Sequence, residues 1–127
     1  MRDRSLVSVP KKGFREGTAR PFNKAVRGHI FHGFIVKKAS KYFAYQNMCR
    51  HLSVTLDADN GDFFTHDKKH LQCHLHGAIY EIDTGLCIGG PCEGARLIPL
   101  DCVEEDARVI VLLPEGFGGK AVPGNET

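Results

Sequence analysis

The sequence lacks any long apolar segment. Its longest apolar run, residues 109–113, is far shorter than the roughly 18 residues that a membrane-spanning helix needs. Residues 1–7 contain no apolar core of a secretory signal peptide. We therefore expect no membrane association, and the cytoplasm is the predicted location.

The chain also lacks a sustained 3.6-residue periodicity, internal repeats and low-complexity tracts, so no amphipathic helix is expected. Alternating, β-branched and aromatic-rich segments separated by polar turns predict short strands instead. The predicted fold is all-β, a small antiparallel sandwich or barrel. The expected strands are 5–10 (an edge strand ending at Pro10), 18–26 (interrupted by Pro21), 29–37, 42–46, 63–65, 69–72, 78–83, 97–103 and 108–113.

A second domain is not expected in a chain of 127 residues. The hydrophobic fraction of 42% and the charged fraction of 25% are typical of a soluble globular protein. The end of the chain, 114–127, contains four Gly and two Pro, and we expect it to be extended and mobile. Residues 1–127 are therefore interpreted as a single domain.

Acidic residues are scarce in the first third of the chain. Residues 1–41 contain eleven Lys and Arg but only two acidic residues, whereas residues 42–127 contain six Lys and Arg and thirteen acidic residues. A basic segment can bind nucleic acid, but here the charges alternate with apolar strand positions and no stacking platform or known motif accompanies them. Solvated strand faces are the favoured interpretation, with steering of a partner as the alternative. No nucleic acid is expected as a partner.

The number of cysteines, five, is odd, which does not suit a disulfide framework in a reducing compartment. Cys49 and Cys73 belong to Cys/His pairs. Cys87, Cys92 and Cys102 are interpreted as small buried hydrophobic residues.

The two Cys/His pairs are the strongest chemical signal in the sequence. Cys49 and His51 form a C-x-H pair, and Cys73 and His76 form a C-x-x-H pair after 21 intervening residues; Gly77 follows the second pair. Two thiolates and two imidazoles could bind zinc tetrahedrally, and a structural zinc module is one alternative. Finger-type sites, however, group like ligands, whereas a mixed pattern suits a binuclear centre with unlike ligands on its two irons.

The segments 47–52, 73–80 and 90–97 together resemble the Rieske [2Fe-2S] family. The resemblance implies a Rieske-like fold, in which a small antiparallel base carries a cluster-binding subdomain of two ligand loops at about 47–97. It implies one [2Fe-2S] cluster, with Cys49 and Cys73 on the inner iron and His51 and His76 on the outer iron. The Gly90-Pro91 segment resembles the family's proline loop, which covers the cluster. Gly77, Ala78, Tyr80 and Pro91 are the expected neighbours of the ligands.

The ligand loops depart from the family pattern at positions that bind no iron. Ser53 stands where Gly is frequent, and His74 where Pro is frequent. High-potential respiratory members carry a disulfide between the loops, but the matching residues here are Val54 and Leu75, so that bridge cannot form.

Ala78 and Tyr80 bear on the redox potential. Respiratory members place at the position of Ala78 a Ser that donates a hydrogen bond to a bridging sulfide. Tyr80 is retained, and we expect its hydroxyl to bond a Cys sulfur. Because donors to sulfur stabilise the reduced cluster, the loss of one donor predicts a potential toward the lower end of the Rieske span of roughly −150 to +300 mV.

The predicted function is one-electron transfer rather than catalysis. Terminal oxygenases of the family add an iron held by two His and a carboxylate, but no His follows His76 here. The resemblance implies a soluble ferredoxin, monomeric when free, that carries electrons from a flavin reductase to an oxygenase or similar acceptor. The alternative is the small Rieske-like subunit of a multi-subunit reductase, such as an assimilatory nitrite reductase.

Overall fold

The computed structural model describes residues 5–48, 55–57, 62–73 and 77–114. The predicted mobility of the chain beyond Pro114 falls outside these residues. The described residues contain strands and no helix, so none of their segments forms a helix that could span a membrane. The all-β prediction is confirmed. The strands are β1 (Leu6–Pro10), β2 (Ala19–Val26), β3 (His29–Lys38), β4 (Lys41–Gln46), β5 (Leu71–Gln72), β6 (Ile79–Tyr80), β7 (Cys87–Gly89), β8 (Pro99–Glu104) and β9 (Arg108–Leu112).

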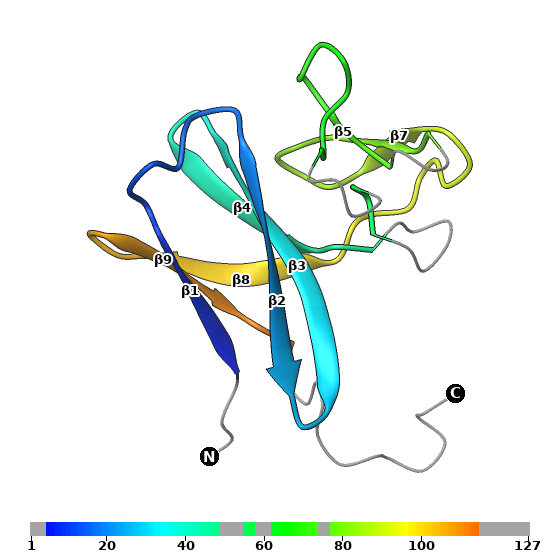
Figure 1. The fold of residues 1–127 in the computed structure, drawn as a ribbon. Helices are drawn as coiled ribbons and strands as arrows, with labels where there is room; N and C mark the ends of the chain where they lie inside the picture. The colour runs from blue at the N-terminus through cyan, green and yellow to red at the C-terminus, as the bar shows by residue number, and fades with distance from the viewer. Residues whose placement is uncertain (1–4, 49–54, 58–61, 74–76, 115–127) are drawn as a thin grey trace.

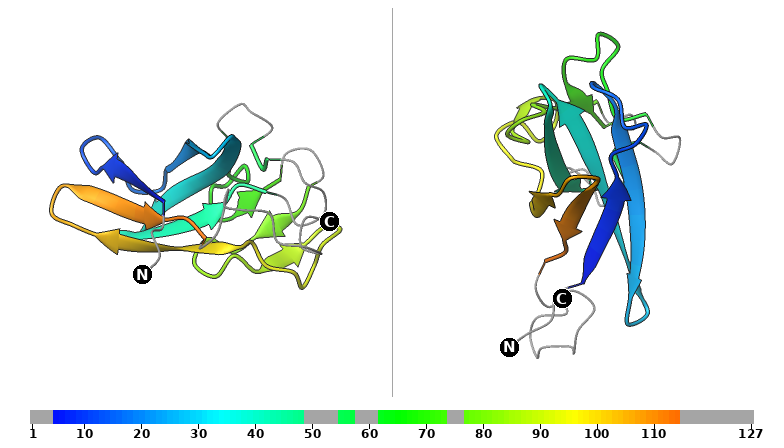
Figure 2. Two further views of the ribbon diagram at one scale, coloured as in Figure 1. Left: turned by 90° about the horizontal axis from the view of Figure 1, so that it is seen from below. Right: turned by 90° about the vertical axis from the view of Figure 1, so that its left-hand side faces the viewer.

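Six strands form one antiparallel sheet in the order β1-β9-β8-β4-β3-β2 (Figure 1). The sheet curls into a nearly closed barrel, as the two views of Figure 2 show. Its edge strands meet through Arg20 of β2, which donates hydrogen bonds to the carbonyls of Pro10 (3.2 Å) and Lys12 (3.3 Å). Pro10 and Pro21 both lie in edge strands, where a missing N–H leaves no unpaired partner inside the sheet.

The β3–β4 hairpin is closed by a two-residue turn. Lys38 pairs with Lys41, and the two residues between them, Ala39 and Ser40, have positive φ angles of 54° and 62°. Two such residues form the tight turn that matches the twist of antiparallel strands. The carboxylate of Glu16 accepts hydrogen bonds from the N–H groups of both turn residues, with Ser40 at 3.0 Å. The predicted hairpin is confirmed, and it leads the chain to Asn47.

The smaller sheet has the order β5-β6-β7. The predicted hairpin before it is present, because Thr65 N donates to His70 O and Gln72 N donates to Phe63 O, each at 2.9 Å. The strand expected over 78–83 is shorter than predicted. It ends at Tyr80, because the chain turns at residues 81–85. Strand β7 was not predicted.

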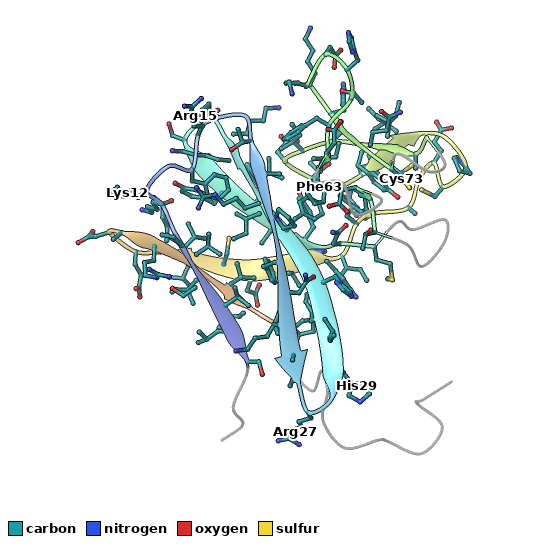
Figure 3. The ribbon with its side chains drawn as sticks, in the orientation of Figure 1. Lys12, Arg15, Arg27, His29, Phe63 and Cys73 are labelled. Carbon is teal, nitrogen blue, oxygen red and sulfur yellow. The ribbon has the colours of Figure 1, made fainter. Side chains whose placement is uncertain are left out.

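Strand β3 has a hydrophobic core on each of its faces. Phe31 and Ile35 pack inside the barrel, whereas Phe34 and Val36 pack against residues of the smaller sheet and its loops. Alternation of side chains across a strand produces this division. Phe63 stacks on Phe34 with ring centroids 4.5 Å apart, and Figure 3 shows it between the barrel and the smaller sheet. The smaller sheet is thereby held against the outer face of the barrel at β3.

Candidate metal centre

One of the four predicted ligands, Cys73, lies among the described residues. It directly follows β5 and is fully buried, with 0% of its surface exposed. Cys49, His51 and His76 lie outside the described residues, as do Ser53, Val54, His74 and Leu75. The site is therefore defined here by Cys73 and by the residues that begin and end the two ligand segments.

The second ligand segment is closed at its base by two backbone hydrogen bonds. Cys73 N donates to Ala78 O, and Gly77 N donates to Cys73 O, both at 2.8 Å. Gly77 has a φ of 77°, in the left-handed region that glycine adopts without strain. Strand pairing of Leu71 with Tyr80 extends this closure into the smaller sheet. The two described residues that flank positions 74–76, Cys73 and Gly77, are thus bonded to each other.

The first ligand segment is closed by Asn47. Its backbone N–H donates to His32 O of β3 at 2.8 Å. Its side-chain Oδ1 accepts a hydrogen bond from Leu56 N at 2.9 Å, across the segment that carries Cys49 and His51. Asn47 is 6% exposed, so the bond is shielded from water. Sequence reasoning assigned no role to Asn47, although its place just before the C-x-H pair was a usable signal.

A third segment lies directly against the second one. Gly90 has a φ of 91°, and a Cβ atom there would stand 2.7 Å from Ala78 Cα and 3.0 Å from Gly77 O. Only glycine allows two backbones to approach so closely. Pro91 is the next residue and is exposed. The covering role predicted for the Gly90-Pro91 segment remains a prediction, but the segment does reach the second ligand loop.

The Tyr80 hydroxyl lies beside a cysteine that is not a predicted ligand, and its expected bond to a ligand Cys remains a prediction. The buried hydroxyl of Tyr80 lies 3.2 Å from Cys92 Sγ, and Cys92 Sγ lies 3.2 Å from Cys87 Sγ. Both sulfurs belong to cysteines outside the predicted ligand set. Ala78 is fully buried and presents a methyl group where a serine would present a donor.

Tyr45 joins the barrel to the smaller sheet. Its hydroxyl donates to Ile82 O at 2.7 Å, and burial raises the pKa of this phenol far above its ordinary value. The phenol therefore stays neutral and remains a donor. Gly85 leaves room for the ring, because a Cβ atom there would lie 2.8 Å from Tyr45 Cε1.

The basic residues of the first third that Figure 3 labels lie away from Cys73. Figure 3 shows Arg27 and His29 at the end of the β2–β3 hairpin, far from Cys73, and Lys12 and Arg15 on the connection between β1 and β2, at the upper left. The described Lys and Arg of residues 5–41 are exposed or half-buried. This agrees with solvated strand faces rather than with a basic site around Cys73.

The residues that are present fit a [2Fe-2S] cluster of the Rieske type. The donor set of two Cys and two His has the hard and soft ligands that such a cluster takes on its two irons. Cys73 lies on the buried side, as expected for a ligand of the inner iron. Gly90 lets a third segment lie against the backbone of the second ligand segment, which a larger residue would prevent.

The described residues define a small all-β domain, a barrel with a second, smaller sheet in which β5 ends beside Cys73. Comparison with family models matches residues 9–109 to the Rieske [2Fe-2S] domain. The chain belongs to this family. It accordingly carries one Rieske-type [2Fe-2S] cluster.

Solved structures with the same fold include ferredoxins and oxygenases. The ferredoxin of carbazole 1,9a-dioxygenase from Nocardioides aromaticivorans IC177 is 22% identical with a TM-score of 0.63, covering 84% of this chain and 96% of that chain. A chain in a complex of reduced oxygenase and oxidized ferredoxin in carbazole 1,9a-dioxygenase is 20% identical with a TM-score of 0.66, covering 92% and 96%. The terminal oxygenase of carbazole 1,9a-dioxygenase from Novosphingobium sp. KA1 is 19% identical with a TM-score of 0.67, covering 92% of this chain but 30% of the oxygenase chain. No curated protein matches the sequence significantly.

Proposed function

We propose that this chain is a soluble, cytoplasmic one-electron carrier that accepts electrons from a flavin reductase and passes them to an oxygenase or similar acceptor. The observation that carries the proposal is the extent of the structural match. The chain spans 96% of a dioxygenase ferredoxin, but only 30% of a terminal oxygenase. A carrier needs the cluster domain and no substrate site of its own.

Cys49 and Cys73 are the proposed ligands of the inner iron, and His51 and His76 those of the outer iron. The bound cluster takes up and releases one electron at a time. The protein holds the ligand segments at fixed ends through Asn47 and through the Cys73–Ala78 backbone pair. Such a preorganised site limits structural change between redox states.

Ligand variants test the site. Cys73→Ser and His76→Ala should each abolish the visible absorption and the electron paramagnetic resonance signal of the reduced cluster, whose average g value is low in this class. Cys102→Ser is the matched control, because Cys102 lies in β8 with its Sγ 3.6 Å from Tyr42 O, and it should keep both signals. A colourless wild-type protein that contains zinc would overturn the cluster assignment.

The carrier role is tested with the loaded protein. Gel filtration should show a free monomer. A flavin reductase supplied with reduced nicotinamide should reduce the cluster, which lowers the visible absorption of the oxidised protein. The photoreduced protein should then pass electrons to a Rieske-type oxygenase. Purification only as part of a large reductase would instead favour the subunit role.

A further inference from the structure

Two thiols outside the predicted ligand set are in contact. Cys87, the first residue of β7, and Cys92, in the turn that follows, have Sγ atoms 3.2 Å apart, and both are reduced in the structure. A disulfide requires a separation of about 2.05 Å. The sulfurs therefore need to approach by only a little more than about 1 Å.

Backbone hydrogen bonds hold the two cysteines in this arrangement. Cys87 N donates to Ala95 O at 2.7 Å, and Gly94 N donates back to Cys87 O at 2.9 Å. Ala95 N donates to Cys92 O at 2.9 Å, which closes the turn at its other cysteine. Because both cysteines are tied to the same residue, the sulfurs stay near each other whatever the turn's side chains do.

The two thiols differ in access. Cys87 is 1% exposed, and its Sγ lies 3.1 Å from Gly89 O. Cys92 is half-buried, so a small reagent in solution can reach it. The hydroxyl of Tyr80 lies 3.2 Å from Cys92 Sγ and can donate to a developing thiolate there. Cys92 is thus placed to react first with a reagent from solution, and Cys87 to complete the bond.

We propose that Cys87 and Cys92 form an oxidisable dithiol that a hydroperoxide converts into an intramolecular disulfide. The Cys92 thiolate attacks one peroxide oxygen and the O–O bond breaks, which gives a sulfenic acid at Cys92 and hydroxide, protonated to water. The Cys87 sulfur then attacks the Cys92 sulfur, the S–O bond breaks, and a second water leaves. Two electrons pass from the two thiols to hydrogen peroxide, and a reducing dithiol reverses the change.

The bond would fix the turn that touches the second ligand segment. Gly90, between the two cysteines, is the residue in contact with the backbone of Gly77 and Ala78. Oxidation would also remove the thiol that faces the Tyr80 hydroxyl. The proposal concerns the thiols alone, so it stands or falls independently of the assigned iron ligands and of the electron acceptor.

Peptide mapping tests the proposal on the purified protein. Cleavage after Glu81 and Glu93 releases residues 82–93, which contain Cys87 and Cys92 and no other cysteine. After treatment with hydrogen peroxide and then iodoacetamide, this peptide should lose both alkylation sites and two hydrogen atoms. Dithiothreitol before alkylation should restore both sites.

Two variants separate this disulfide from other oxidation. Cys102→Ser should respond as the wild type does, because Cys102 has no part in the pair. Cys87→Ser should leave Cys92 as a sulfenic acid that dimedone traps, with no loss of two hydrogens. If peptide 82–93 of the wild type stays fully alkylated, accumulates sulfinic acid at Cys92 with Cys87 still reduced, or is found linked between two chains, the proposal is wrong.

Discussion

Gly90 lies where the Gly89–Leu97 segment meets the backbone of the second ligand segment. It combines a φ of 91° with a Cβ position 2.7 Å from Ala78 Cα, so a side chain there is opposed both by conformation and by contact. Gly94, in the same segment, has a similar φ of 94° but nothing within 4 Å of its Cβ position. The two glycines therefore separate backbone strain from steric contact.

We predict that Gly90→Ala lowers the free energy of unfolding by about 2–4 kcal/mol, since left-handed strain adds to a clash with rigid backbone. Gly94→Ala should lower it by only about 1 kcal/mol, from strain alone. Urea unfolding followed by circular dichroism measures both. Equal losses in the two variants would mean that the contact at Gly90 carries no energy.

Ala78 offers a test of how the protein sets the potential. We predict that Ala78→Ser raises the midpoint potential by about 60 mV, the one-electron equivalent of a hydrogen bond about 1.4 kcal/mol stronger in the reduced state. The control is Ala44→Ser, an equally small change at a residue 3% exposed inside the barrel, which should leave the potential unchanged. Redox titration measures the midpoint potential of both variants. If the potential of Ala78→Ser equals that of the wild type, the hydrogen-bond explanation is wrong.

The C-x-H and C-x-x-H pairs could be identified from sequence because their chemistry lies in residue type and short spacing. The hydrogen bonds of Asn47 could not be predicted, although its place before the C-x-H pair marks it, since its partners His32 and Leu56 are brought to it by the fold. The contact between Cys87 and Cys92 was hidden for a similar reason. In the sequence each cysteine is typical of a small buried residue. Only the turn that joins them brings the two Sγ atoms into contact.

Among the elements, the β3–β4 turn depends on a charge from elsewhere in the chain. Glu16 accepts hydrogen bonds from the N–H groups of Ser40 and Ala39, and these bonds hold the pKa of its carboxyl below the ordinary value of 4.5. A depressed pKa in the folded state means that the stabilisation is complete above the unfolded-state pKa. It is lost as the pH falls through the lower folded-state value.

We therefore predict that Glu16→Gln is less stable than the wild type at pH 7 and that this difference shrinks as the pH falls below about 4.5. Urea midpoints of the two proteins across this range give the measurement. Lys12→Gln serves as a control for the loss of one surface charge near the same loop. A difference between wild type and Glu16→Gln that is constant with pH would show that the carboxylate's charge is irrelevant.

Strands were predicted correctly where the residue pattern of two segments and the short connection between them both indicate a hairpin. Strands β3 and β4 are rich in β-branched and aromatic residues, and the short segment between them closes a tight hairpin. Prediction failed for β6, since alternation continues through Asp83 while the chain turns after Tyr80 to bring Glu81 N to Leu86 O. It also failed for β7, a three-residue strand in a glycine-rich stretch that pairs only because β6 lies beside it.

At the scale of the whole molecule, one strand is shared by the barrel and the metal-bearing part. Ile35 is fully buried in the barrel core, while its neighbours Phe34 and Val36 are fully buried in the core that includes Cys73. Tyr45, on the adjacent strand, bonds Ile82 across the same junction. Each core covers one face of β3, so loss of either core exposes fully buried side chains of this strand, and we propose that residues 1–127 unfold as one domain.

The prediction is that damage to the barrel releases the cluster at the same denaturant concentration at which the barrel unfolds. Ile35→Ala should cost about 2–5 kcal/mol, the usual range for truncating a fully buried isoleucine. Because the barrel core and the metal-bearing core share β3, the midpoint of cluster loss should fall together with the midpoint of the far-ultraviolet transition. Anaerobic urea titrations followed by visible absorption and by circular dichroism compare the two midpoints directly.

Ile30, which is 59% exposed, supplies the control variant Ile30→Ala, which should move neither midpoint appreciably. If Ile35→Ala lowered the circular dichroism midpoint and left cluster loss where it is in the wild type, the metal-bearing part would be an independent folding unit.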